Sequence, residues 1–138
     1  MEKKAIVLNT VEMISQLMGE LESKAFEAEG FSGITLRQMF YLETIALLEK
    51  PTFSDLAEHL QVTPPSVSAI VKKLIRLGLV SKQQAPDDGR MYLLSLTERG
   101  LHFNNLHNEV HRILAKRIIQ NLTEEEIEEL AELLSKIT

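Results

Sequence analysis

The sequence of 138 residues contains no cysteine and no tryptophan, and aromatic residues make up only 5% of it. The absence of cysteine excludes disulfides, thiolate metal sites and a cysteine nucleophile, and it is compatible with a reducing compartment. No stretch approaches the roughly 18 apolar residues that a membrane span needs. The early apolar run AIVL ends at Asn9, which is too soon for a signal peptide. We therefore expect a cytoplasmic protein with no membrane partner.

Motifs for enzyme chemistry are also missing. The sequence has no Gly-rich phosphate loop, no nucleophile elbow and no pair of carboxylates in a recognisable setting. The densest acidic run, within 124–129, begins a predicted helix, where carboxylates complement the helix dipole and stay solvated. We therefore expect a protein that is not an enzyme and that requires no cofactor.

Charge is distributed unevenly along the chain. The net charge is -5, yet residues 62–99 carry six Lys and Arg against three Asp and Glu, and both flanking segments are acidic. A basic segment inside an acidic chain is typical of a local nucleic-acid-binding surface. Chance clustering of charges on a solvated surface is the alternative.

Hydrophobic periodicity predicts a mostly α-helical protein with one small β-hairpin. Apolar residues at steps of three and four indicate helices, and two β-rich segments flank the turn-forming sequence APDDGR. The expected helices span 4–28, 35–49, 54–60, 64–77, 97–121 and 124–137, and the expected strands span 79–84 and 91–96.

Residues typical of helix ends mark several of these boundaries. Thr35 and Thr123 each begin a capping-box pattern, and Ser54 is the expected cap of the first short helix. Pro64 suits a first helical position, and Gly78 suits a helix end. The last helix is expected to bury a stripe of four residues: Ile127, Leu130, Leu134 and Ile137.

The order of the central elements is that of a winged helix-turn-helix. A short helix, a tight turn, a second helix with an exposed basic face and then a hairpin follow one another, and in this arrangement the second helix enters the major groove of DNA. Its polar face carries Pro65, Ser66, Ser68, Ala69, Lys72, Lys73 and Arg76. At the hairpin tip, Arg90 is placed to reach the minor groove, where the negative potential is concentrated.

On these residues the chain resembles the MarR (multiple-antibiotic-resistance regulator) family of winged helix-turn-helix transcriptional regulators. The resemblance covers nearly the whole chain and rests on three segments: ITLRQMFYLETI, FSDLAEHLQVTPPSVSAIVKKLIRLGLV and DDGRMYLLSLTERG. It implies one MarR-like domain over 1–138, in which dimerisation helices in 1–33 and 100–138 flank a winged helix-turn-helix core in 34–99.

The resemblance also implies a function and the residues that perform it. A homodimer is expected to bind double-stranded DNA at a pseudo-palindromic operator, with repression as the common mode. The expected DNA-binding residues are Ser66, Ser68, Ala69, Lys72, Lys73, Arg76 and Arg90. Asp88 is expected to hold the wing in shape by pairing with a nearby arginine. A winged-helix module that binds proteins is the alternative, and the basic residues argue against it.

Members of the resembled family usually release DNA when a small molecule, an oxidant or a metal binds. The absence of cysteine excludes thiol oxidation here. For a small aromatic or phenolic effector, the expected pocket residues are Met18, Arg37, Met39 and Phe40. Methionine and phenylalanine at helical spacing also fill ordinary cores, which is the competing interpretation.

Two histidines raise the question of metal. His107 and His111 are four residues apart on one predicted helix, a spacing that places two imidazoles on one face for zinc. A zinc-responsive branch of the resembled family has histidines at similar positions and a glutamate where Glu22 falls. Its further histidine corresponds to Phe40 here, with His102 and Glu43 as the candidate replacements. Zinc is therefore the less favoured effector, and two surface or interface histidines are the alternative.

Overall fold

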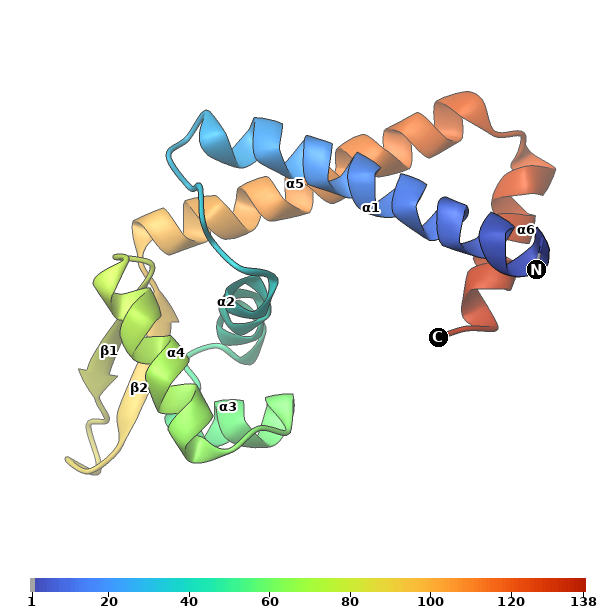
Figure 1. Ribbon diagram of the computed structural model, residues 1–138. Coiled ribbons are helices and arrows are strands. Elements are labelled where there is room, and N and C mark those ends of the chain that lie inside the picture. The colour runs from blue at the N-terminus through green and yellow to red at the C-terminus, as the bar shows by residue number, and fades with distance from the viewer. Residues whose placement is uncertain (1) are drawn as a thin grey trace. The chain divides into compact units, whose positions relative to one another are not determined.

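The computed structural model describes residues 2–138, which form six helices and one two-stranded antiparallel sheet (Figure 1). The observed order confirms the predicted mostly helical fold with a hairpin. The elements are α1 (Glu2–Glu27), α2 (Leu36–Leu48), α3 (Phe53–Leu60), α4 (Pro64–Arg76), β1 (Val80–Gln84), β2 (Tyr92–Leu96), α5 (Glu98–Asn121) and α6 (Glu124–Ser135).

The chain divides into two compact units. The winged unit comprises Phe26–Leu106, and the helical unit comprises the residues up to Ala25 together with His107–Thr138. The winged unit is longer at both ends than the predicted core of 34–99. An aromatic cluster accounts for this, because the ring of Phe103 lies 4.8 Å from that of Phe26 and 5.3 Å from that of Phe31 between centroids. The linker after α1 and the first turns of α5 therefore belong to the winged unit.

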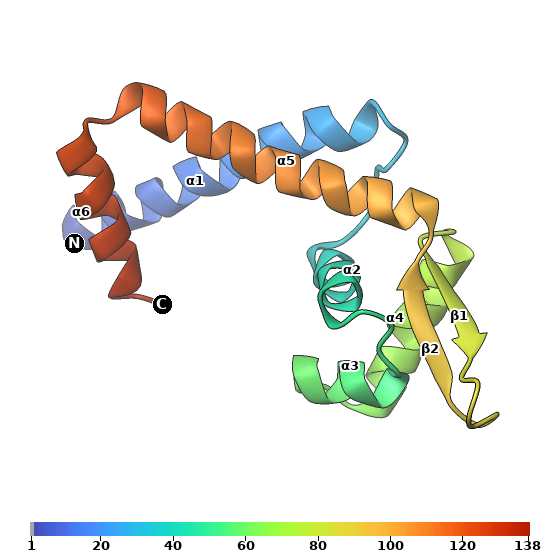
Figure 2. The ribbon, with the colours of Figure 1, turned by 180° about the vertical axis from the view of Figure 1, so that it is seen from behind.

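The winged unit holds most of the buried core. Helices α2, α3 and α4 pack on one another, and the hairpin packs against α2, α3 and α4 (Figures 1 and 2). Leucine and branched side chains from every one of these elements are excluded from solvent. Fully buried examples are Leu42, Ile45, Leu56, Val67, Val71, Leu74, Leu79 and Leu94.

Two predicted helix starts are confirmed and one is wrong. Thr35 and Thr123 form the expected capping boxes with Gln38 and Glu126. Helix α3, however, is capped by Thr52 and not by Ser54. The hydroxyl of Thr52 accepts a hydrogen bond from the backbone N–H of Asp55, and the Asp55 carboxylate accepts one from the backbone N–H of Thr52. This reciprocal pair satisfies two helix-end donors, which a cap at Ser54 would leave unpaired.

The turn between α2 and α3 attaches the hairpin to the helices. The backbone N–H of Leu94 donates to the carbonyl of Pro51 at 2.8 Å, and Thr52 forms an antiparallel bridge with Leu93. To reach this position the chain takes positive φ angles of 50° at Glu49 and 58° at Lys50, which L-residues adopt at a cost. The bridge therefore fixes the wing relative to the helix-turn-helix.

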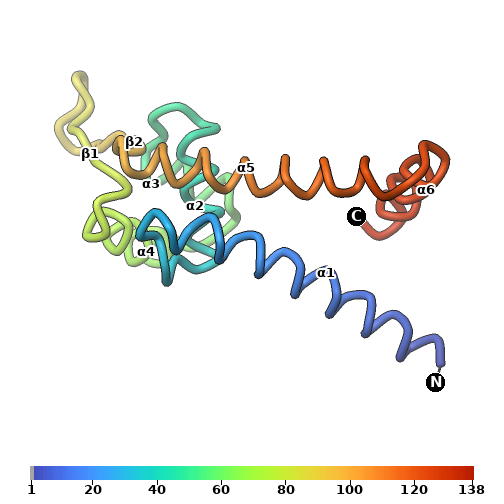
Figure 3. Tube along the Cα trace, turned by 90° about the horizontal axis from the view of Figure 1, so that it is seen from above, coloured from blue at the N-terminus to red at the C-terminus, as the bar shows by residue number. Residues whose placement is uncertain are grey.

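The helical unit, by contrast, leaves most of its apolar side chains exposed. Ile137 of the final segment is 81% exposed and Leu134 of α6 is 45% exposed, and no residue of α6 is buried. The predicted burial of the α6 stripe is therefore wrong for the single chain. Figure 3 shows the cause, because α1 and the end of α5 diverge and leave α6 without a neighbouring layer. Among the described residues, no helix is long and apolar enough to span a membrane.

Candidate nucleic-acid interface

Helix α4 is anchored by one apolar face and leaves the opposite face open. Val67, Val71 and Leu74 are fully buried, which is the spacing of a single helical face. Pro64 and Pro65 occupy the first positions of the helix. The first backbone N–H groups of a helix have no partner within it, so the missing N–H of a proline costs little there. The helix is thus fixed from behind and can present its outer face to a groove of DNA.

The predicted DNA-binding side chains of α4 lie on or beside this open face. Ser68 is half-buried, and the exposed members are Ser66, Ala69, Lys72, Lys73 and Arg76. Within residues 2–138, the side chains of the two lysines and the arginine form no hydrogen bond or ion pair. Cationic side chains without an internal partner remain available to bind phosphates and the edges of guanine bases. The small residues come first along the helix, so its N-terminal end can approach a base closely.

The wing extends beyond the strands as a short, tightly bonded loop. Strand β1 pairs with β2 from Val80↔Leu96 to Gln84↔Tyr92, and the ammonium of Lys82 lies 4.8 Å from the centre of the Tyr92 ring. Arg90 lies in the loop, is exposed, and its guanidinium has no partner among the described residues. The winged unit therefore carries unpaired cations on both α4 and the wing loop, and Figure 2 shows these two elements from behind.

Asp88 stabilises the wing loop by bonding to the backbone of a nearby arginine and not to its guanidinium. Its Oδ1 accepts a hydrogen bond from the backbone N–H of Arg90 at 2.9 Å, and it forms no ion pair with an arginine side chain in the part of the chain that the structure describes. The expected arginine pairing is therefore corrected to a side chain–backbone turn of the Asx type. The guanidinium of Arg90 is left available for DNA.

Gln84 closes the same loop from the strand side. Its Nε2 donates to the carbonyl of Gly89 at 2.8 Å.

We expect Gln84→Leu to weaken DNA binding about three- to tenfold, because losing one hydrogen bond of about 0.5–1.5 kcal/mol loosens the loop that positions Arg90. Fluorescence anisotropy on labelled DNA measures the change. Gln83→Leu is the matched control, since Gln83 is exposed and its side chain has no bond to the loop. Equal effects of the two variants would show that Gln84 does not position the loop.

The residues predicted for an effector pocket do not all lie in one place. Arg37 and Phe40 line a common pocket in the winged unit. Met39 is buried in the core at 6% exposure, where it packs rather than lines a cavity. Met18 lies in the helical unit and is half-buried there. The pocket that Arg37 and Phe40 share is also lined by Tyr41, a residue that helical periodicity does not single out.

The two histidines lie close together, but the described residues hold no three-ligand metal cluster. The rings of His107 and His111 are 4.6 Å apart between centroids, edge to face. His107 is 6% exposed, whereas His111 is exposed and Glu22 is half-buried. No group of three His, Cys, Asp or Glu side chains in residues 2–138 is arranged to hold a metal ion. Zinc binding at these residues stays a prediction.

His102 and Glu43, the candidate replacement ligands, are also placed by the structure. The Nε2 of His102 lies 3.3 Å from a carboxylate oxygen of Glu29, and its ring lies 5.7 Å from that of Phe31. His102 therefore joins the linker after α1 to the first turns of α5. Glu43 is half-buried on α2.

Comparison with known proteins agrees with this geometry. A family model described as "MarR family" matches residues 32–91. The transcriptional repressor MdtR of Bacillus subtilis is 26% identical over 125 residues, which cover 90% of this chain and 80% of MdtR.

Solved structures share the fold over nearly the whole length. Streptococcus pneumoniae FabT in complex with DNA superposes with a TM-score of 0.80 at 23% identity, covering 98% of this chain and 94% of FabT. S. aureus MepR bound to ethidium bromide superposes with a TM-score of 0.72 at 25% identity, covering 94% of this chain and 91% of MepR. The similarity thus extends over the winged unit and the helices that flank it.

Proposed function

We infer that this chain is a member of the MarR family of DNA-binding transcriptional regulators, and we propose that it is a homodimeric repressor that binds a pseudo-palindromic operator. The observation that carries the proposal is the set of unpaired cations on α4 and the wing loop. The relative MdtR is named a transcriptional repressor, which supports repression over activation. DNA as the target also favours the cytoplasm as the place of action.

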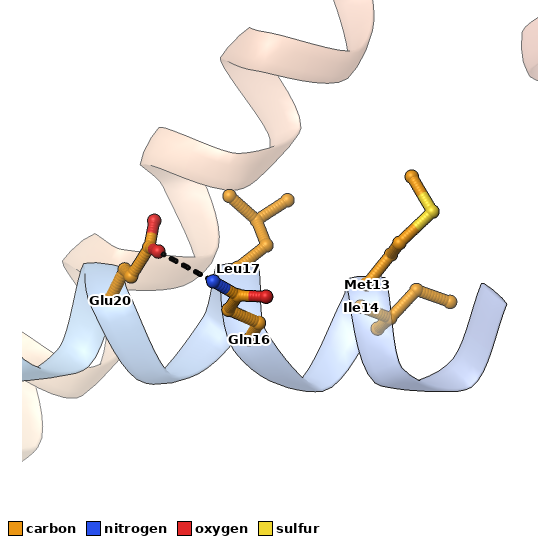
Figure 4. Close-up of a pocket in the computed structure, with 5 residues that line it drawn as sticks. All are labelled: Met13, Ile14, Gln16, Leu17 and Glu20. Atoms are coloured by element: carbon orange, nitrogen blue, oxygen red, sulfur yellow. Dashed lines mark hydrogen bonds between the residues drawn. The ribbon is translucent and has the colours of Figure 1, made fainter. Parts of the chain in front are cut away.

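The exposed apolar residues of the helical unit support dimerisation. Ile6, Val11 and Ile14 of α1 are each more than half exposed, and a monomer rarely leaves so large an apolar surface in water. Figure 4 shows Met13 and Leu17 projecting from the same side of α1 beside Ile14, at a surface hollow of about 370 Å³. A second copy of this helical unit would cover these side chains, and a two-fold axis would match the symmetry of the operator.

Release from DNA by a small molecule completes the proposal. MepR has been solved with the organic cation ethidium bound, which supports effector binding within the family without identifying the effector here. The repressor itself needs no cofactor for DNA binding.

A charge placed in the exposed apolar surface tests the dimer. We expect Ile14→Glu to weaken dimerisation by at least about 100-fold, because burying an unpaired carboxylate costs several kcal/mol. Binding to a palindromic site should fall with it. Sedimentation velocity measures the dimer, and circular dichroism checks that the helices persist. Leu47→Glu is the matched control, since Leu47 is 69% exposed but lies in the winged unit. A monomeric wild type, or an Ile14→Glu variant that dimerises as well as Leu47→Glu, would contradict the proposal.

A further inference from the structure

The first turns of α2 and α4 line a pocket of about 450 Å³, which lies wholly within the winged unit. The pocket opens onto the surface, because five of its lining residues are exposed: Arg37, Phe40, Val62, Thr63 and Ser66. Ser66 is also an expected DNA contact at the N-terminal end of α4. An open pocket beside that residue can admit a group that projects from a DNA strand.

The N-terminus of α4 supplies donors to this pocket. Pro64 and Pro65 have no backbone N–H, so the first N–H of the helix is that of Ser66, and the Thr63 side chain does not cap it. The hydroxyls of Thr63 and Ser66 lie 2.9 Å apart, and two hydroxyls that share one hydrogen bond keep a second hydrogen to donate elsewhere. Uncapped N–H groups at the positive end of a helix dipole bind anions.

A second and independent feature of the pocket is a polar group that the protein does not satisfy. Tyr41 is only 3% exposed, and its hydroxyl is buried without a hydrogen-bond partner in residues 2–138. Native proteins satisfy nearly all such groups, so an orphaned one in a pocket indicates an acceptor from outside the chain. Burial raises the pKa of the Tyr41 hydroxyl, and the nearby positive charge of Arg37 offsets this only in part. The hydroxyl therefore stays protonated at neutral pH and can donate.

Arg37 supplies the charge of the pocket. It is exposed, and its side chain forms no ion pair or hydrogen bond in the part of the chain that the structure describes. A guanidinium presents parallel N–H groups that match the paired oxygens of a phosphate. A cation, hydroxyl donors and a helix N-terminus around one open pocket therefore fit the phosphodiester group of a nucleic acid, whose two outer oxygens share a negative charge.

We propose that this pocket holds one phosphate of the DNA backbone, bound by Arg37 and the Tyr41 hydroxyl, so that α2 contacts DNA in addition to α4 and the wing loop. The inference rests on the DNA-binding part of the proposed function and not on repression. Phosphate contacts fix the register of a protein on the duplex without reading its sequence. The pocket thus determines how the N-terminal end of α4 enters the groove, and it assigns Arg37 to DNA and not to an effector.

The salt dependence of binding tests the charge of Arg37. On a labelled duplex of mixed sequence, followed by fluorescence anisotropy, we expect Arg37→Met to weaken binding at least about tenfold at low salt, as for a hydrogen bond to a charged group. The slope of log affinity against log salt should fall by about one for each bound subunit. Lys50→Met should change neither value, and it is the matched control because Lys50 is an exposed cation of the same unit outside this pocket.

Tyr41→Phe separates a role in DNA binding from a role in folding. The variant should weaken DNA binding about three- to tenfold with an unchanged salt slope, because the lost donor is neutral. It removes a buried hydroxyl that has no partner, so the free protein should be as stable as the wild type or more stable in denaturant unfolding. A less stable Tyr41→Phe variant would mean that the chain itself satisfies the hydroxyl, and it would overturn the assignment of Tyr41.

Replacing single phosphates locates the contact on the DNA. In a duplex selected for binding, each phosphate is exchanged in turn for a neutral methylphosphonate. One position in each half-site should weaken the wild type and Lys50→Met but leave Arg37→Met unaffected, because this variant has already lost the contact. Equal sensitivity of the wild type and Arg37→Met at every position would overturn the proposal.

The remaining outcomes separate the pocket from the proposed function. A wild type that binds no duplex would reject both. Loss of binding in Arg37→Met, in a protein that selects no operator, would retain the pocket and reject the operator. Wild-type DNA binding by Arg37→Met, together with saturable shifts of the Thr63 and Ser66 amide resonances on addition of inorganic phosphate, would make the pocket a site for a free anion and overturn the DNA contact.

Discussion

Replacing both Lys72 and Arg90 with alanine is expected to lower the affinity for operator DNA by roughly 10²- to 10³-fold, at about 1–3 kcal/mol for each lost contact. The two residues lie on different elements, α4 and the wing loop, and neither side chain has a partner within residues 2–138. Their replacement therefore removes positive charge from α4 and the wing loop without breaking an internal bond. If both contact phosphates, the slope of log affinity against log salt should fall by about two.

A control variant that removes two positive charges from another part of the chain shows whether the position of the charges matters. Lys3 and Lys4 are exposed lysines of α1, so Lys3→Ala with Lys4→Ala removes the same charge from the helical unit. Titrations at several salt concentrations, with sedimentation to confirm the oligomer, compare the two double variants. Equal losses in both would mean that only net charge matters, and an unchanged affinity for Lys72→Ala with Arg90→Ala would reject these residues as contacts.

Gly100→Ala is expected to destabilise the winged unit by about 3 kcal/mol or more. Gly100 is buried in the first turn of α5. An added Cβ would overlap the carbonyl oxygen of Leu79 and lie 2.9 Å from its carbonyl carbon. That carbonyl oxygen also accepts the backbone N–H of Thr97 at 3.0 Å, so it cannot move away without losing a hydrogen bond. Because both sides of the contact are backbone, no rotamer change relieves it.

Denaturant unfolding at fixed protein concentration measures this change, and the chain contains its own control. Gly19 is exposed in the middle of α1, and an added Cβ there meets nothing within 4 Å. Gly19→Ala should change stability by no more than about 1 kcal/mol, in the stabilising direction, because alanine is the better helix former. A Gly100→Ala variant as stable as Gly19→Ala would show that α5 can shift away from Leu79 at no cost.

Local patterns in the sequence were sufficient to predict the elements of the winged unit. The buried set Val67, Val71 and Leu74 follows directly from helical periodicity, and Gly78 ends this segment with a positive φ of 76°, as expected at a helix end. The sequence predicts the wrong cap for α3 because threonine and serine are both good caps, and Thr52 and Ser54 lie two residues apart. Only the reciprocal bond with Asp55 distinguishes them, and it depends on the direction from which the chain enters the helix.

Hydrophobic periodicity does not predict features that depend on contacts between distant segments of the chain. Tyr41 belongs to an ordinary helical pattern, and its unsatisfied hydroxyl is visible only once α2, α3 and α4 are packed. The linker joins the winged unit because Phe26 and Phe31 meet Phe103, about 70 residues later in the sequence. Periodicity predicts that the apolar stripe of α6 is buried, but it does not distinguish burial within the same chain from burial against a partner.

Sequence-specific DNA binding by a dimer is tested most simply by selecting bound sequences from a random pool of double-stranded DNA, at physiological salt and with the full chain. We expect enrichment of an inverted repeat whose half-sites lie about one helical turn apart, because each α4 of a two-fold dimer would read one half-site. Addition of zinc or a chelator in parallel tests His107 and His111. Enrichment of a single half-site would contradict the dimer. No enrichment under any condition would contradict sequence-specific DNA binding and favour a winged helix that binds proteins.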